Sequence, residues 1–128
     1  MTEIFPRKTA DIVSLCFGPP VSVNRMYRAI QVHGRTRNLI SYEYRKWKER
    51  EGSALESQSP ACVPGKFTCL IVVPSNCRHD LDNTAKGFLD LLQSHNVIEN
   101  DRHMVELTIK RGNVKDISTI TVKKAVNS

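Results

Sequence analysis

Three aspartates and one lysine within a short stretch of this sequence are of the types that bind metal ions and act on phosphates. Asp80 and Asp82 lie two residues apart, and Lys86 and Asp101 follow them. In an extended chain, side chains two residues apart point to the same side, so the pattern predicts two adjacent carboxylates with Leu81 turned to the core. A helix after Asp82 and a returning chain can then bring Asp101 beside them.

Carboxylates gathered in this way need a cation. At a separation of about 4 Å and an effective dielectric constant of about 20, two of them repel by about 4 kcal/mol. Mg²⁺ takes oxygen ligands, commonly carboxylates together with substrate phosphate oxygens, and such a site can activate water for phosphodiester cleavage. We therefore expect Mg²⁺ at Asp80, Asp82 and Asp101, with Lys86 supplying positive charge near the scissile phosphate.

Each of these residues also has an ordinary structural interpretation. Asp is a preferred N-cap residue, so Asp82 alone can cap a helix. Asp82 and Lys86 have the spacing of a surface ion pair on a helix, and Asp101 suits a turn. The spacing alone leaves both interpretations open.

The elements expected around these residues form an α+β domain. Strands are predicted where apolar or alternating residues run for the length of a strand, and helices where apolar residues recur at the helical period. The predicted strands cover residues 11–17, 66–73, 103–110 and 117–122, and the predicted helices cover residues 41–57 and 82–95. Ser41 would cap the first helix, and Gly112 with Asn113 would turn the last two strands into a hairpin. The expected architecture is one domain over residues 1–128, a mixed β-sheet flanked by two helices in the order β-α-β-α-β-β.

A basic stretch over residues 24–38 is expected to be a long loop. Its arginines can contact DNA phosphates, although a solvated mobile loop explains the same composition and the two properties are compatible. Tyr27 can stack on a base or pack at the base of the loop. The first helix carries positive charge with glutamates interspersed, which favours a plain solvated face.

Composition and charge restrict the class of protein. The chain has 128 residues, a common size for one domain, with 19 Lys+Arg against 13 Asp+Glu and a net charge of +6. This charge permits a nucleic-acid partner without requiring one. No apolar run approaches a membrane span and the first residues lack a secretory signal, so we expect a cytoplasmic protein. The cysteine spacings match neither a disulfide framework nor a structural zinc site, which predicts reduced thiols.

The run Asp80-Leu81-Asp82-Asn83, followed by Lys86 and Asp101, resembles the motif of the RusA family of Holliday junction resolvases. In that family a lysine follows the Asn and a further aspartate comes later, usually in an Asp-Asp pair. A second similarity is the turn Gly18-Pro19-Pro20 followed by Asn24-Arg25-Met26-Tyr27. The resemblance covers most of the chain, with matching length and element order.

The resemblance implies a homodimeric, Mg²⁺-dependent crossover-junction endodeoxyribonuclease that nicks four-way DNA junctions in pairs during recombination and repair, with Mn²⁺ able to substitute. It carries over Asp80, Asp82 and Asp101 as metal ligands and Lys86 as the catalytic lysine. It also implies a bacterial or phage origin, with no membrane partner and no small-molecule cofactor. Asn100 departs from the Asp often found before the last aspartate, which leaves less negative charge beside the metal.

The expected DNA contacts combine this resemblance with the basic stretches of the sequence. They are Asn24, Arg25, Tyr27, Arg28, Arg35, Arg37, Arg78 and His79. The run of Arg78 and His79 before the first aspartate is shorter than in some members of the family.

Three other functions remain open at this point. The first is a nuclease of the same chemistry that acts on a different branched DNA. The second is a non-catalytic DNA-binding module with the same fold, and the third is a structural protein whose basic charge is incidental. The last predicts no junction binding, whereas phosphate contacts make affinity fall steeply with salt.

Overall fold

The computed structural model describes residues 7–126, whose main feature is a four-stranded mixed sheet. Its strands are β1 (Ile12–Phe17), β4 (Phe67–Val73), β5 (Met104–Arg111) and β6 (Ser118–Lys124), in the spatial order β1-β6-β4-β5. β4 pairs parallel with β5 and antiparallel with β6, and β1 pairs antiparallel with β6. The predicted α+β class with a mixed sheet is therefore confirmed.

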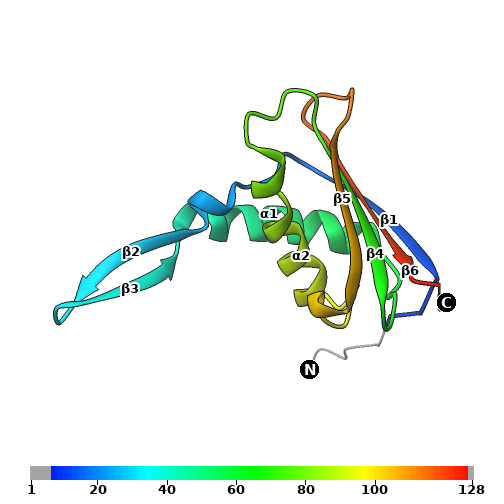
Figure 1. The fold of residues 1–128 in the computed structure, drawn as a ribbon, viewed down its shortest axis with the longest axis horizontal. Helices are drawn as coiled ribbons and strands as arrows, with labels where there is room; N and C mark the ends of the chain where they lie inside the picture. Colours follow the sequence, from blue (N-terminus) through cyan, green and yellow to red (C-terminus); the bar gives the residue numbers. More distant parts are fainter. Residues whose placement is uncertain (1–6, 127–128) are drawn as a thin grey trace.

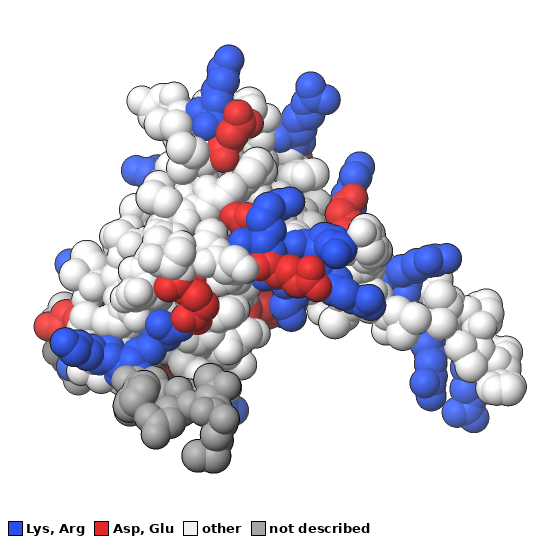
Figure 2. All heavy atoms as spheres, turned by 180° about the vertical axis from the view of Figure 1, so that it is seen from behind, with Lys and Arg blue, Asp and Glu red and all other residues white. Residues whose placement is uncertain are grey.

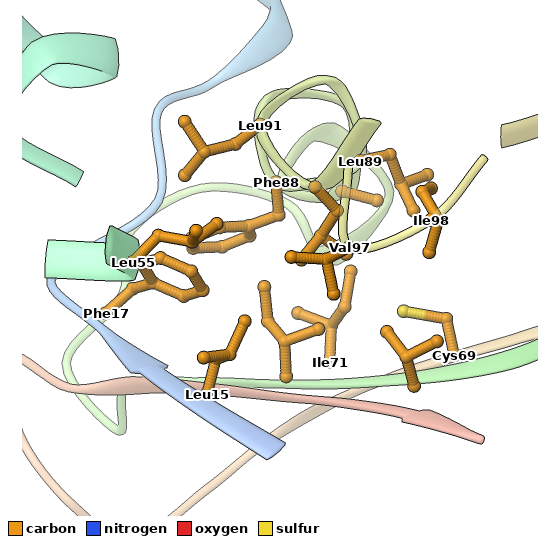
Figure 3. Packing of buried hydrophobic residues seen from close by; sticks show 14 of the residues in the cluster. Leu15, Phe17, Leu55, Cys69, Ile71, Phe88, Leu89, Leu91, Val97 and Ile98 are labelled. Atoms are coloured by element: carbon orange, nitrogen blue, oxygen red, sulfur yellow. The ribbon is translucent and has the colours of Figure 1, made fainter. Parts of the chain in front are cut away.

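Two helices cover one side of this sheet, as Figure 1 shows. Helix α1 (Tyr42–Ser57) begins where the sequence predicts, because the Ser41 hydroxyl accepts the Tyr44 backbone N–H at 3.0 Å. Helix α2 (Ala85–Ser94) buries its apolar stripe. Figure 3 shows Phe88 of α2 and Leu55 of α1 above Leu15 and Ile71 of the sheet, and each of these four side chains is buried. The core thus lies between the helices and the sheet.

Helix α2 packs tightly against α1 at Gly87, near its start. A Cβ atom at this position would lie 2.8 Å from Val21 Cγ1 and 3.2 Å from the Trp47 ring. Trp47 is itself held by a 2.9 Å hydrogen bond from its indole N–H to the Pro19 carbonyl. The absence of a side chain at Gly87 therefore lets the first turn of α2, which carries Lys86, rest against α1.

The long loop predicted over residues 24–38 is wrong. After a short 3₁₀ turn, η1 (Val23–Arg25), the chain forms a second, two-stranded sheet from β2 (Tyr27–Val32) and β3 (Arg35–Ile40). His33 and Gly34 connect the strands with φ of 51° and 76°, and positive φ at both central residues is the geometry of a tight hairpin turn. The hairpin, which we call the β2–β3 arm, projects from the domain (Figure 1).

The predicted hairpin between the last two strands is also wrong, because β4 lies between β5 and β6. The chain leaves β5 through Gly112, whose N–H donates to the Val73 carbonyl at 2.9 Å. A Cβ atom on Gly112 would lie 2.7 Å from Val72 Cγ1. The connection therefore runs tightly over the end of β4, and β4 acquires a hydrogen-bonded neighbour on each edge.

Two smaller expectations concern cysteines and membranes. Cys16, Cys62, Cys69 and Cys77 are all free thiols, as predicted. None of the helices formed by residues 7–126 combines the length and the apolar character of a membrane span.

Candidate active site at the start of helix α2

Asp80 and Asp82 lie in the segment that joins β4 to α2, but not as the sequence predicts. Asp80 is extended (φ −63°, ψ 141°), and the chain then coils into the 3₁₀ turn η2 (Leu81–Asn83). The Asn83 backbone N–H closes this turn by donating to the Asp80 carbonyl at 3.0 Å. Because a 3₁₀ helix has about three residues per turn, residues two apart do not share a side. The prediction that Asp80 and Asp82 lie in an extended segment with their carboxylates on one side is therefore wrong.

The start of α2 also differs from the prediction. The helix begins at Ala85 with Thr84 at the N-cap position, so Asp82 does not cap it. The Thr84 hydroxyl donates to the Leu81 carbonyl at 2.6 Å, which ties η2 to the helix. Asp80 and Asp82 are both exposed just before the positive end of α2, where the helix dipole favours anions. Lys86 lies in the first turn of the helix.

Asp101 reaches the same region from the other end of α2. It opens the 3₁₀ turn η3 (Asp101–His103), in which the Asn100 side chain accepts the Arg102 N–H at 3.0 Å. The Asp101 backbone N–H donates to Gln93 Oε1 of α2 at 2.9 Å. The contact with Gln93 docks η3 on α2, where Asp101 is partly buried. Asn100, which stands where the RusA family often has Asp, caps the η3 turn.

Lys86 is the residue that connects these elements. Its Nζ lies 3.1 Å from Asp90 Oδ1, one turn along α2. The hydrogen bond that Lys86 donates to Asp90 raises the pKa of Lys86 above its ordinary value of 10.5, and the charge of Asp90, followed by Tyr27 and Asp101, raises it further. Asp101 is therefore close enough to Lys86 for its charge to act on the ammonium group.

Asp90 and Tyr44 complete the surroundings of Lys86, and neither is among the site residues that the sequence predicts. The Tyr44 hydroxyl donates to Asp90 Oδ2 at 3.0 Å. Burial and the Asp90 charge raise the pKa of Tyr44, so the phenol stays protonated. Tyr27 lies edge-on to Tyr44 with ring centroids 6.4 Å apart. Asp90 could have been found from the sequence, because it lies four residues after Lys86 on the same helix. Tyr44 could not, because it lies 46 residues away from Asp90 in the sequence.

The three aspartates have the chemistry of a Mg²⁺ site without being gathered into one. Within residues 7–126, no group of three His, Cys, Asp or Glu side chains lies close enough to hold a metal ion. In the same part of the chain, the carboxylates of Asp80, Asp82 and Asp101 make no side-chain hydrogen bond or ion pair. Oxygen-only ligands of this kind suit Mg²⁺, so the donor set fits the ion.

The predicted DNA contacts fall into two groups. Arg78 and His79 directly precede Asp80, and His79 lines a surface cavity of about 500 Å³ together with Arg25, Lys46 and Arg50. Arg25 also forms an ion pair with Glu43 at 3.5 Å. The other group belongs to the β2–β3 arm, and Asn24 lies in the η1 turn at its root. The arm contains Tyr27, Arg28, Arg35 and Arg37, all exposed.

Basic side chains therefore extend from the candidate site onto the arm. Figure 2 shows lysines and arginines gathered over the body beside the arm, with further ones along the arm itself. Lys46 and Arg50 of α1 are exposed and pair with Glu49 and Glu51, as the predicted solvated face requires, and they also line the cavity beside His79. Their spacing of four residues puts them on one side of the helix, which is the signal that could have found them.

Comparison with known proteins assigns no family. No protein-family model matches the chain, and no curated protein matches its sequence.

Proposed function

We propose that this protein is a Mg²⁺-dependent endodeoxyribonuclease of the RusA type that resolves four-way DNA junctions by paired nicks. The observation that carries the proposal is that Asp101, held against α2 by its backbone hydrogen bond to Gln93, is among the charges that act on Lys86. The later aspartate of the RusA-like motif thus acts electrostatically on its lysine, although neither residue lies near the other in the sequence. The overall +6 charge agrees with a polyanionic substrate.

Asp80, Asp82 and Asp101 would hold the Mg²⁺ ion in the proposed enzyme. When bound, the ion supplies activation of water and neutralisation of negative charge on the phosphate. Asp80 and Asp82 precede the positive end of α2, and Asp101 is fixed by its backbone hydrogen bond to Gln93. The proposal requires the three carboxylates to converge when DNA and metal are bound, because their mutual repulsion is then offset.

Lys86 would contact the phosphate whose charge increases during cleavage. Its side chain is half-exposed, and with a pKa above 10.5 the amine is cationic at neutral pH. Asp90 would position this amine, since its carboxylate is shared between Lys86 and the buried Tyr44 hydroxyl. Because Asp90 already holds the Lys86 amine in position, little reorganisation energy is needed when negative charge develops on the phosphate.

We further propose a homodimer that works in the cytoplasm of a bacterial cell and is encoded by a bacterium or a phage. A two-fold symmetric pair of sites suits a junction that offers two equivalent strands for cleavage. The oligomeric state can be checked by light scattering during size-exclusion chromatography. A monomer both alone and on DNA would contradict paired nicking by one complex.

The decisive experiment is cleavage of a labelled four-way junction, beside a linear duplex of the same sequence. Both are incubated with Mg²⁺, with Mn²⁺ and with chelator. Paired nicks in the junction that need the metal and disappear in Asp82→Asn, while junction binding persists, are the expected result. Glu106→Gln on the exposed side of β5 is the matched control, which keeps full activity.

Each other outcome selects one of the alternatives. Cleavage of flaps or forks in preference to the junction would indicate a nuclease for another branched DNA. Tight junction binding without nicks at any Mg²⁺ or Mn²⁺ concentration would indicate a non-catalytic binding module. Failure to bind DNA would contradict the whole proposal.

A further inference from the structure

The β2–β3 arm has two faces of different chemistry. In an antiparallel pair, residues directly opposite each other share a face, and the faces alternate along each strand. One face therefore carries the three cross-strand pairs Arg28–Leu39, Ile30–Arg37 and Val32–Arg35. The other face carries the three pairs Tyr27–Ile40, Ala29–Asn38 and Gln31–Thr36.

All arginines of the hairpin thus lie on one face, which we call the arginine face. Every cross-strand pair on it joins one arginine to one aliphatic residue, and the opposite face has no charged side chain. Arg28, Arg35 and Arg37 are exposed, and none of them forms an ion pair within residues 7–126. No Asp or Glu occurs anywhere in β2, β3 or their turn. The arm therefore presents uncompensated positive charge in a single direction.

The geometry of the ladder suits a nucleic-acid duplex. Successive pairs on one face of a ribbon are two residues apart, so the arginines are spaced about 7 Å along the arm. A two-stranded ribbon fits the DNA major groove, which is about 12 Å wide. Arginine is the residue best suited to phosphate oxygens and guanine edges, because its guanidinium donates two parallel hydrogen bonds.

The arm is anchored at its root although it makes no pairing with the main sheet. Ser41 donates its backbone N–H to the Met26 carbonyl at 2.9 Å and its hydroxyl to the Arg25 carbonyl at 2.6 Å. The same hydroxyl caps α1 by accepting the Tyr44 N–H. An isolated hairpin is only marginally stable in water, so this anchoring holds the arm in a defined direction relative to α1.

The root of the arm adjoins the candidate active site. Tyr27, the first residue of β2, lies edge-on to Tyr44, and Tyr44 is hydrogen-bonded to Asp90, the partner of Lys86. DNA held along the arm would therefore lie on one side of the position where cleavage is proposed. The arm extends away from the body (Figure 1), so it would contact duplex that flanks that position.

We propose that the arginine face of the β2–β3 arm is the duplex clamp of this protein, binding one DNA arm that flanks the cleavage position. The inference rests on the proposed DNA substrate and specifies which surface provides affinity. It differs from general attraction by a basic protein, because the affinity depends on one face of one hairpin and not on the net charge.

The test compares two triple variants of equal charge. Arg28→Gln/Arg35→Gln/Arg37→Gln removes the arginine face, and Lys110→Gln/Lys115→Gln/Lys123→Gln removes three exposed lysines from the β4–β6 side of the domain. The probes are a labelled four-way junction and a labelled linear duplex. Binding is measured by fluorescence anisotropy over a range of salt concentrations, with chelator present so that nothing is cleaved.

The expected result is a loss of affinity for both probes of at least about tenfold in the arginine variant and less than about threefold in the lysine variant. The slope of log affinity against log salt should become shallower by about 2–3 in the arginine variant only, since each phosphate contact contributes about 0.9. Arg28→Lys/Arg35→Lys/Arg37→Lys should recover most of the salt-dependent affinity, which excludes misfolding of the arm as the cause.

The failures of this inference and of the proposed function are distinguishable. Equal losses in the two Gln variants would overturn the clamp and leave the nuclease proposal intact. An arginine variant that binds both probes as tightly as the unmodified protein would also overturn the clamp and leave the nuclease proposal intact. An unmodified protein that binds neither probe would overturn both proposals.

Discussion

Lys86 Nζ and Asp90 Oδ1 lie 3.1 Å apart on successive turns of α2, and the other oxygen of Asp90 accepts the hydroxyl of Tyr44. One carboxylate is therefore shared between an exposed amine at the candidate site and a buried phenol on the other helix. Asp90 thus links Lys86 at the start of α2 to Tyr44 of α1.

Replacing Asp90 should change the titration of Lys86. Asp90→Asn is expected to shift the pKa of Lys86 back toward 10.5, because the hydrogen bond and charge of Asp90 are the main causes that raise it. The measurement is the titration of the side-chain carbon signals of Lys86 by NMR in ¹³C-lysine-labelled protein, with Lys86→Arg to assign them. Glu106→Gln is the control and leaves the titration unchanged. An unshifted Lys86 titration in Asp90→Asn would contradict the pairing.

The buried Tyr44 hydroxyl should contribute to stability. Tyr44→Phe removes a hydrogen bond to a charged acceptor, and the expected loss in the free energy of unfolding is about 1.5–3 kcal/mol. Tyr42 is the matched control, because it is 71% exposed against 2% for Tyr44. Urea denaturation should show a lower midpoint for Tyr44→Phe and no change for Tyr42→Phe. Equal midpoints for both variants would mean that the hydrogen bond to Asp90 has no net effect.

A side chain at Gly87 should push the helices apart. Gly87→Ala gains helix propensity of about 1 kcal/mol, but its Cβ would approach Val21 Cγ1 to 2.8 Å. Overpacking of this kind costs about 1–3 kcal/mol, and the stiff β-branched Val21 cannot rotate freely out of the way. We therefore expect a net loss of stability in thermal unfolding.

A second substitution separates steric conflict from other causes at Gly87. Val21→Ala removes the nearest of the atoms that the new methyl group would meet. In the Val21→Ala background, Gly87→Ala should be neutral or stabilising, so the two effects are not additive. Additive losses would show that contact with Val21 is not the reason.

Stability should fall with acid partly through Glu56. A hydrogen bond from His95 is the largest cause that lowers the pKa of Glu56 below 4.5, and the charge of Arg7 acts in the same direction. A carboxyl whose pKa is lower in the folded state stabilises the protein above pH 4.5, and this contribution disappears as the pH falls through the folded value. Glu56→Gln should therefore lower the melting temperature at pH 7.

The same comparison at lower pH provides the control. The difference in melting temperature between Glu56→Gln and the unmodified protein should shrink steadily below pH 4.5. A difference that is equal at neutral and acidic pH would indicate a packing effect instead of an electrostatic one. Glu49→Gln is a suitable second control, since its ion pair with Lys46 joins two exposed side chains at 3.6 Å and such pairs contribute little.

The sequence by itself determined the elements whose causes are local. Ser41 caps α1 through a hydrogen bond to a residue three positions on, and the apolar stripe of α2 follows from the helical period. The apolar runs of β1 and β4 and the alternation in β5 and β6 predicted strands that the structure contains. The arm was missed because its residues are mostly polar and its turn is His-Gly, which is a weaker signal than Asn-Gly or Asp-Gly.

Only the tertiary structure decided how these elements meet at the candidate site. β4 lies between β5 and β6 because a buried central strand satisfies the hydrogen-bonding groups of both its edges, and adjacency in the sequence carries no information about that choice. Leu81–Asn83 coil into a turn instead of extending, which separates the sides of Asp80 and Asp82. Asp101 comes near Lys86 because η3 docks on α2 through Gln93, a contact between distant residues that no local pattern encodes.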